Sequence, residues 1–234
     1  MNPVRSIENK TRNEVKYTLE RRHVGAAAAW LEHHCAPDPE YGRGAIHSLY
    51  YDTPGLGLLE QKVQSEYLKW KVRLRWYTDE AGAQGADAAF LEVKSKEGVR
   101  GGKFRTRVEL DGALLRRDPL EAGRRLDLAE LLDPAHAYGT AQLAPACVIR
   151  YVRHRFIEME SGNRVSLDSR IGVTQANPDF RLRTHLPELD TAVLEVKGAV
   201  EPDLPRCLHG LCLLTDARWA AFSKYGECMS RLLE

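Results

Sequence analysis

Apolar and polar residues alternate with a period of two along eight segments of the chain, a pattern typical of strands with two different faces. These segments are Arg12 to Leu19, Gly44 to Asp52, Trp70 to Tyr77, Phe90 to Lys96, Lys103 to Leu110, Val148 to Ile157, Val165 to Ile171 and Thr191 to Lys197. Helical patterns occur at Val24 to Cys35, Leu56 to Gln64, Arg116 to Leu132 and, as two helices, within Pro202 to Leu233. The arrangement predicts an α+β fold, and because no internal repeat is present we expect one domain over residues 1–234.

Basic side chains gather on one face of strand after strand. Lys71, Arg73 and Arg75 share one face of the third segment, opposite Val72 and Leu74. Over all such faces thirteen basic residues stand against five acidic ones, although the net charge of the chain is only +1. The basic set is Lys16, Lys71, Arg73, Arg75, Lys94, Lys96, Lys103, Arg105, Arg107, Arg153, Arg155, Arg164 and Lys197, and the acidic set is Glu14, Glu92, Glu109, Asp168 and Glu195.

Two interpretations fit a sheet with one basic face. Either the face is solvated, as charged strand faces usually are, or it points inward and lines a tunnel whose apolar outer face is covered by helices. The agreement among so many strands favours the tunnel. Cations crowded in such a channel need counter-charge, so its ligand carries several closely spaced negative charges, and phosphate chains suit the mixture of Arg and Lys.

Composition excludes several other classes of protein. With 34 basic and 33 acidic residues and 43% apolar positions, the chain can close a core. No apolar run approaches the roughly 18 residues of a membrane span, and the first residues lack an apolar signal region. The five cysteines form no C-x-x-C pair, so we expect reduced thiols and a cytoplasmic protein.

Eight short motifs lie in order along nearly the whole chain. They are Arg12-Asn-Glu14-Val-Lys16-Tyr17, Tyr51-Asp52-Thr53-Pro54, Lys71-Val-Arg73-Leu-Arg75-Trp-Tyr77, Leu91-Glu92-Val-Lys94, Tyr151-Val-Arg153, Arg164-Val-Ser-Leu-Asp168, Leu194-Glu195-Val-Lys197 and Phe222-Ser223-Lys224-Tyr225. No single motif is specific, whereas the ordered set is. The set resembles the catalytic domain of the vacuolar transporter chaperone (VTC) family, polyphosphate polymerases within the CYTH, or triphosphate tunnel metalloenzyme, superfamily.

The resemblance implies an antiparallel tunnel of eight strands with a polar, basic lumen and helices packed outside. It also implies Mn²⁺ or Mg²⁺, held by Glu195 with Glu14 as the second candidate ligand. The residues expected to act on the phosphate chain are Lys16, Arg73, Arg75, Lys94, Arg153 and Lys197, joined in phosphate binding by Arg164, Lys224 and the hydroxyl of Ser223. Glu92 and Asp168 are expected either to orient neighbouring cations through ion pairs or to contact the metal.

The sequence departs from relatives at two informative positions. Other CYTH branches, such as adenylate cyclases and thiamine triphosphatases, open with E-x-E-x-K, and Arg12 replaces the first Glu here. Those activities are therefore less expected. Ala221 stands where the eukaryotic relatives lead us to expect a basic residue, which predicts a lost phosphate contact. Because no signalling domain or membrane helices accompany the domain, any membrane coupling is expected to need a separate membrane protein.

Three functions are compatible with these residues. The first is a metal-dependent polyphosphate polymerase that transfers the γ-phosphoryl group of ATP onto a polyphosphate chain. The second is a tripolyphosphatase or nucleoside triphosphatase, which needs an activated water. The third is a polyphosphate or nucleotide sensor without catalysis. Oligomeric state is left open.

Other motifs point less clearly to chemistry. The glycines around Gly98 to Lys103 have the wrong spacing for a P-loop, and the cluster of His33, His34 and Cys35 is more typical of a helix surface than of a metal site. Inward basic faces do not suit double-stranded DNA, so no DNA partner is expected, and single-stranded nucleic acid stays a minor alternative.

Overall fold

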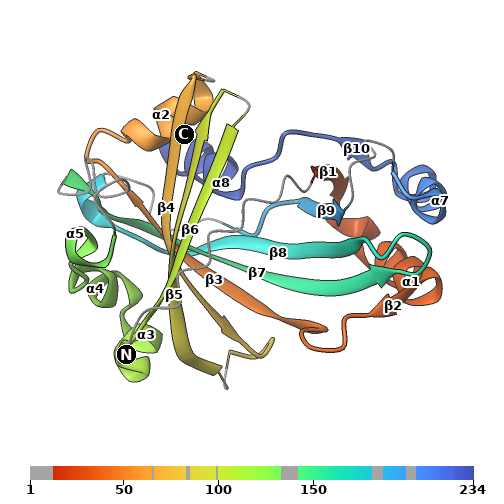
Figure 1. Cartoon of the computed structure of the whole chain (residues 1–234), viewed down its shortest axis with the longest axis horizontal. Coiled ribbons are helices and arrows are strands. Elements are labelled where there is room, and N and C mark those ends of the chain that lie inside the picture. The colour runs from red at the N-terminus through yellow and green to blue at the C-terminus, as the bar shows by residue number, and fades with distance from the viewer. Residues whose placement is uncertain are drawn as a thin grey trace.

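The computed structural model describes residues 13–64, 66–82, 85–98, 100–132, 142–180, 187–198 and 204–234. Within these ranges the strands form one antiparallel sheet of ten strands in the order β10-β1-β9-β8-β7-β3-β4-β5-β6, with β2 paired to β7 beside this path (Figure 1). The strands are β1 (Asn13–Glu20), β2 (Cys35–Pro37), β3 (Arg43–Asp52), β4 (Leu68–Thr78), β5 (Gly85–Glu97), β6 (Arg100–Val108), β7 (Ala144–Glu158), β8 (Arg164–Ala176), β9 (Thr191–Gly198) and β10 (Arg218–Trp219).

All eight predicted strands are present as β1 and β3 to β9. The expected number of strands was too low, because β2 and β10 have three and two residues and are too short to show an alternating pattern. The sheet is also not closed, since no pairing among the described residues joins β6 to β1 or β10. The sheet is strongly curled instead. Lys94 on β5 lies 3.9 Å from Glu14 on β1, although five other strands lie between β5 and β1 in the sheet.

The helices follow the predicted segments with one exception. The helices α1 (Val24–His34), α2 (Gly57–Val63), α7 (Arg206–Thr215) and α8 (Lys224–Leu233) match their predictions closely. The predicted helix at residues 116–132 is wrong, because the chain forms α3 (Gly112–Arg117), α4 (Pro119–Arg124) and α5 (Leu128–Leu131) there. Asp118 leaves the helical conformation and caps α4, whose first residue is Pro119. Short 3-10 turns occupy Arg21–His23 and Pro178–Phe180.

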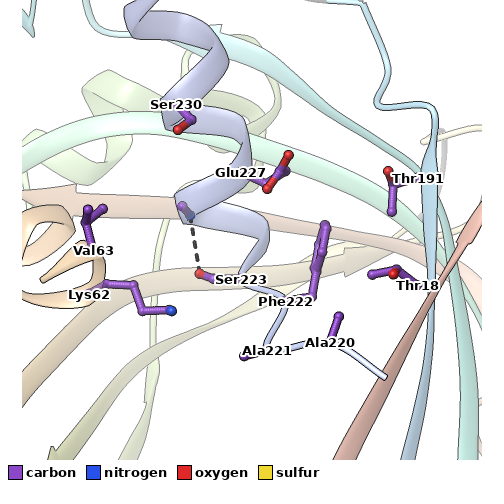
Figure 2. A pocket seen from close by; sticks show the side chains of 11 residues that line it. Thr18, Lys62, Val63, Thr191, Ala220, Ala221, Phe222, Ser223, Glu227 and Ser230 are labelled. Carbon is purple, nitrogen blue, oxygen red and sulfur yellow. Dashed lines mark hydrogen bonds between the residues drawn. The ribbon is translucent and has the colours of Figure 1, made fainter. Parts of the chain in front are cut away.

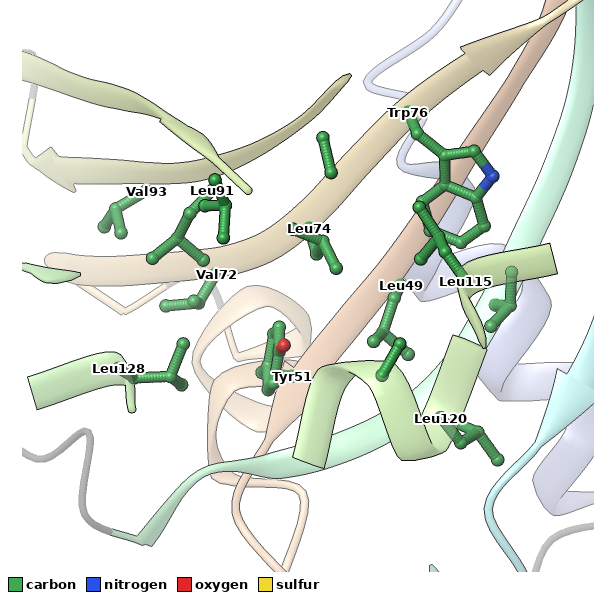
Figure 3. Packing of buried hydrophobic residues seen from close by; sticks show 14 of the residues in the cluster. Leu49, Tyr51, Val72, Leu74, Trp76, Leu91, Val93, Leu115, Leu120 and Leu128 are labelled. Carbon is green, nitrogen blue, oxygen red and sulfur yellow. The ribbon is translucent and has the colours of Figure 1, made fainter. Parts of the chain in front are cut away.

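Helices cover the convex face of the sheet in two places. Over β3, β4 and β5 the side chains of Leu49, Leu74 and Leu91 pack against α3, α4 and α5 through residues such as Leu115 and Leu120 (Figure 3). Over β8 and β9, at the other end of the molecule in Figure 1, α1 and α7 bury a second cluster. The apolar side of the alternating strands therefore faces helices, as the sequence predicts.

The helix α8 lies on the concave face instead. Its Tyr225 stacks on Tyr50 of β3 with 4.7 Å between the ring centroids, and Met229 contacts the thiol of Cys147 on β7. The prediction that all helices pack outside the sheet is thus wrong for α8. Part of the concave face is apolar, and it buries the apolar side of this amphipathic helix.

Two further predictions concern cysteines and membrane spans. All five cysteines are free thiols, as expected from their spacing. Among the residues that the structure describes, no helix combines the length and apolarity needed to cross a bilayer.

Candidate functional site

The basic side chains of the concave face are organised around buried carboxylates, the first of which is Glu92 on β5. Its Oε2 accepts hydrogen bonds from Nε and Nη2 of Arg73 at 2.8 and 2.6 Å. Arg75 and Arg105 approach the same carboxylate to 3.7 and 3.6 Å. Burial alone would raise the pKa of Glu92, but Arg73 and Arg75 outweigh it and hold that pKa far below its usual range. Glu92 is therefore a fixed anion that orients three arginines from β4 and β6.

Asp168 on β8 is the second such anchor. It is fully buried, its two oxygens accept bonds of 2.6 Å from Arg153 on β7, and Lys224 at the start of α8 lies 2.5 Å away. Burial would raise the pKa of Asp168, but the positive charges of Arg153 and Lys224 lower it on balance. Glu92 and Asp168 both form ion pairs that orient cations, which is one of the two roles expected for them.

Glu195 and Glu14 form the third acidic centre. Lys197 Nζ lies 2.5 Å from Glu195 and 3.6 Å from Glu14, so one ammonium group lies against both carboxylates. Lys16 is 2.6 Å from Glu14, and Arg153 is 3.4 Å from Glu195. The pKa of Glu195 lies well below its usual range, because Arg153 and Lys197 outweigh the effect of burial.

This centre suits a divalent cation held partly by the substrate. No group of three or more potential protein ligands lies together among the described residues, so a cage made only of protein is absent there. Glu14 and Glu195 nevertheless offer two neighbouring carboxylates beside a cluster of cations. Mg²⁺ is commonly bound by one or two carboxylates together with phosphate oxygens and water, and this donor set fits that pattern.

Aromatic hydroxyl groups line the floor between these centres. Arg75 donates to Tyr151 and Ser48, each at 3.3 Å, and Arg73 donates to Tyr50 at 3.5 Å. The ring of Tyr151 also lies 4.5 Å from the ammonium group of Lys224. These contacts hold the long cationic side chains in defined positions on one surface.

Lys71 on β4 differs from the cations described above. Its Nζ donates to Ser223 Oγ at 3.2 Å, and no carboxylate among the described residues lies within ion-pair distance of it. Burial and the charges of Arg73 and Lys16 lower the pKa of Lys71 to about 7. Ser223 in turn caps α8 by accepting from the backbone N–H of Gly226.

A pocket of about 520 Å³ opens beside Ser223, between β1, α2 and the start of α8 (Figure 2). Ala221 lines it, and so does Lys62 from α2, whose side chain reaches toward Ser223. Position 221 thus carries no basic residue, but α2 brings Lys62 to the same pocket.

The structure brings together most of the residues predicted from sequence. Around the three acidic centres and the start of α8 lie Glu14, Lys16, Arg73, Arg75, Lys94, Arg153, Glu195, Lys197, Ser223 and Lys224. Arg164 does not join them: it is exposed at the first position of β8, where its charge acts on Asp38. Arg12 lies outside the described residues.

Sequence reasoning left several site residues out. Lys71 lies in a motif and on a basic strand face but was given no role in the site, and Arg105 lies on a basic strand face outside every motif. Tyr50 and Tyr151 alternate with the arginines in neighbouring strands, and their role depends on strand register. A search for polar residues on the basic face of every strand, in addition to the motifs, would have found all four.

Comparison with known proteins places this site in a family. A family model described as VTC domain matches residues 11–233. Among solved structures, a "putative adenylate cyclase" from Bacillus halodurans superposes with a TM-score of 0.57 at 13% identity, covering 92% of this chain and 95% of that one. The Mediator head module of Schizosaccharomyces pombe gives a TM-score of only 0.41 at 12% identity, over 88% of this chain and 97% of that one, too weak to indicate a shared fold.

A search of curated protein sequences finds no significant match. The likeness to this solved structure supports the sheet-rich α+β fold expected from the sequence, with the strand number and the open edge described above. The family model extends over nearly all of the chain, and it includes every motif and every residue of the site. The chain belongs to the VTC domain family.

Proposed function

We propose that the protein is a metal-dependent polyphosphate polymerase that transfers the γ-phosphoryl group of ATP onto a polyphosphate chain. Membership of the VTC domain family supports a role with polyphosphate or nucleotides. The polymerase reaction itself is proposed from one observation. Four cationic side chains converge on the concave face, and a buried carboxylate or hydroxyl holds each of them: Arg73, Arg75, Arg153 and Lys224. Pre-positioned cations of this kind suit a chain of phosphates.

The reaction needs little covalent chemistry from the protein. In phosphoryl transfer the enzyme aligns donor and acceptor and stabilises charge on the equatorial oxygens of the transferred group. Arg73, Arg75 and Arg153 are placed to bind those oxygens, and Lys16, Lys94 and Lys197 to bind neighbouring phosphates. The terminal oxygen of a polyphosphate chain is already deprotonated, so no strong general base is required.

Glu195 and Glu14 are the residues that would hold Mn²⁺ or Mg²⁺ together with phosphate oxygens. When bound, such an ion supplies neutralisation of charge that builds up on the phosphoryl oxygens. The chain's own part is to keep both carboxylates ionised, which Lys197, Lys16 and Arg153 do in the structure.

The test is incubation of the purified protein with ATP and Mn²⁺, with polyphosphate followed on a gel and free phosphate followed by colorimetry. Polymer that is lost in Glu195→Ala and kept in Glu121→Ala, a control on α4 outside the site, is the expected result. Phosphate without polymer would instead identify a tripolyphosphatase or nucleoside triphosphatase. Binding without either product would identify a sensor.

Three wider expectations go with this proposal. We expect residues 1–234 to form one domain. We expect the protein to be cytoplasmic, where ATP is available. A separate membrane protein is the candidate partner that would receive the product. None of these bears on the geometry of the site, and each stays a prediction.

A further inference from the structure

The basic side chains of the concave face differ in how close the nearest carboxylate lies. Arg73, Arg153 and Lys224 each have a buried carboxylate within 2.6 Å. Lys197 has Glu195 at 2.5 Å and Lys16 has Glu14 at 2.6 Å. Lys94 is more loosely placed, 3.9 Å from Glu14. Every one of these cations therefore enters the reaction with protein counter-charge at hand.

Lys71 lacks such a partner within the described part of the chain. Its Nζ contacts the hydroxyl of Ser223 at 3.2 Å and lies 5.9 Å from the centre of the Tyr50 ring. The groups that face it are Arg73 on its own strand, Tyr50 on β3, Lys16 on β1, Lys94 on β5, and Ser223 and Lys224 on α8. All the charged members of this set are positive.

The nearby acid at the end of β3 is already engaged. Both oxygens of Asp52 accept hydrogen bonds, from the hydroxyl of Tyr225 at 2.7 Å and from the backbone N–H groups of Thr53, Leu58 and Leu59. Burial raises the pKa of Asp52, and it is not among the groups whose charge acts most strongly on Lys71. Within the described part of the chain, an ammonium group at Lys71 therefore has no carboxylate partner until an anion arrives.

We propose that Lys71 is an additional phosphate-binding residue, which takes its counter-ion from a phosphoryl group of the ligand, together with the hydroxyl of Ser223. The proposal rests on the function proposed above, because it assumes a phosphate chain on the concave face. It assigns one end of that chain to the junction of β4 and α8, where Ser223 also lines the pocket of about 520 Å³.

The hydrogen bond between the two residues gives the assignment its chemistry. A neutral amine can accept the proton of the Ser223 hydroxyl, whereas an ammonium group can only donate. Once Lys71 is charged, Ser223 Oγ accepts from Lys71 and from the backbone N–H of Gly226, and its own O–H is free to donate to a phosphate oxygen. Ligand binding and proton uptake by Lys71 are thus coupled.

The experiment is titration calorimetry of tripolyphosphate without divalent metal, near pH 8, in several buffers of different ionisation enthalpy. The dependence of the measured enthalpy on the buffer gives the number of protons taken up on binding. We compare wild type with Lys71→Met and with Lys69→Met, which removes the same charge two residues away on β4.

Lys71→Met is expected to weaken tripolyphosphate binding roughly ten- to a hundredfold and to take up about one proton less than wild type. Lys69→Met is expected to keep the proton uptake of wild type and to weaken binding no more than about threefold. Because Lys94 and Lys103 also have lowered pKa values, the difference between wild type and the variant is the quantity that isolates Lys71.

Equal affinity and equal proton uptake in wild type and Lys71→Met would overturn the inference while leaving the proposed function intact. Wild type that does not bind tripolyphosphate would overturn the proposed function, and the inference with it. Should Lys71→Met fail to fold, the ¹³Cε resonance of Lys71 in wild type, assigned with Lys71→Arg, decides the matter. Its titration must move to higher pH when tripolyphosphate is added, and an unmoved titration would contradict the inference.

Discussion

Arg153 and Asp168 are direct neighbours across the β7–β8 pairing, and their side chains form two parallel hydrogen bonds of 2.6 Å in the interior. Lys224 from α8 reaches the same carboxylate. One buried acid therefore joins two strands of the sheet to the helix on its concave face. Removal of its charge leaves two cations without their partner.

Asp168→Asn is therefore expected to lower the free energy of unfolding by about 3 to 5 kcal/mol. The measurement is urea denaturation followed by circular dichroism. Asp216→Asn serves as control, because Asp216 forms an exposed pair with Arg218 and its loss is expected to have no measurable effect. Equal stability of the two variants would contradict the anchoring role of Asp168.

Phosphate affinity should depend on Arg75 far more than on Arg164. Arg75 lies between Tyr151, Ser48 and Glu92, whereas Arg164 is exposed at the start of β8. Arg75→Ala is expected to weaken tripolyphosphate binding by about 1.5 to 3 kcal/mol, the range for a charge-assisted hydrogen bond. Arg164→Ala is expected to change it by less than about 0.5 kcal/mol. Calorimetry decides, and an equal loss in both variants would place Arg164 back in the site.

Stability should rise with pH above neutrality, because of Lys71. Its folded pKa is about 7 while an unfolded lysine has a pKa of about 10.4, so between these values the unfolded chain binds more protons and stability increases with pH. Lys71→Met removes this contribution, so its stability is expected to be higher than that of wild type by on the order of 4 kcal/mol near pH 7 and to converge with it near pH 10. Thermal unfolding at several pH values measures both curves, and parallel curves would contradict the lowered pKa.

Two glycine substitutions should have opposite effects on stability. A Cβ at Gly123 on α4 would lie 2.2 Å from Leu49 Cδ2 and 3.0 Å from Tyr51 Oη, so Gly123→Ala is expected to cost about 1 to 3 kcal/mol. Gly25 on α1 has open space around its Cβ position, and Gly25→Ala is expected to stabilise the protein by about 0.5 to 1 kcal/mol. Melting temperatures of the two variants test the packing of α4 on β3, and a neutral Gly123→Ala would show that α4 is loosely packed.

Strands were predictable from sequence because their signal is local. In β4 the alternation of Lys71, Arg73 and Arg75 with Val72 and Leu74 follows directly from the opposite directions of successive side chains, and it holds whatever the strand pairs with. The helix predicted at residues 116–132 failed for an equally local reason. Leucine spacing suggested continuity, while Asp118 and Pro119 end one helix and begin another.

The position of α8 relative to the sheet could not be predicted from a local pattern. Its apolar stripe shows that it packs against something, but both faces of the sheet offer apolar surface. The choice of the concave face depends on Tyr50 and Tyr225 stacking and on Lys224 meeting Asp168, contacts between residues far apart in the chain.

The sequence by itself determined that this chain forms alternating strands with one basic face, and its ordered motifs indicated the family. Only the tertiary structure decided which of those cations have a carboxylate partner and which, such as Lys71, have none among the described residues. Ion pairing depends on strand register and on the curl of the sheet, which brings Glu14 beside Lys94 and Lys197 and leaves Lys71 among positive charges. Such distances follow from the packing of the whole chain rather than from any local pattern.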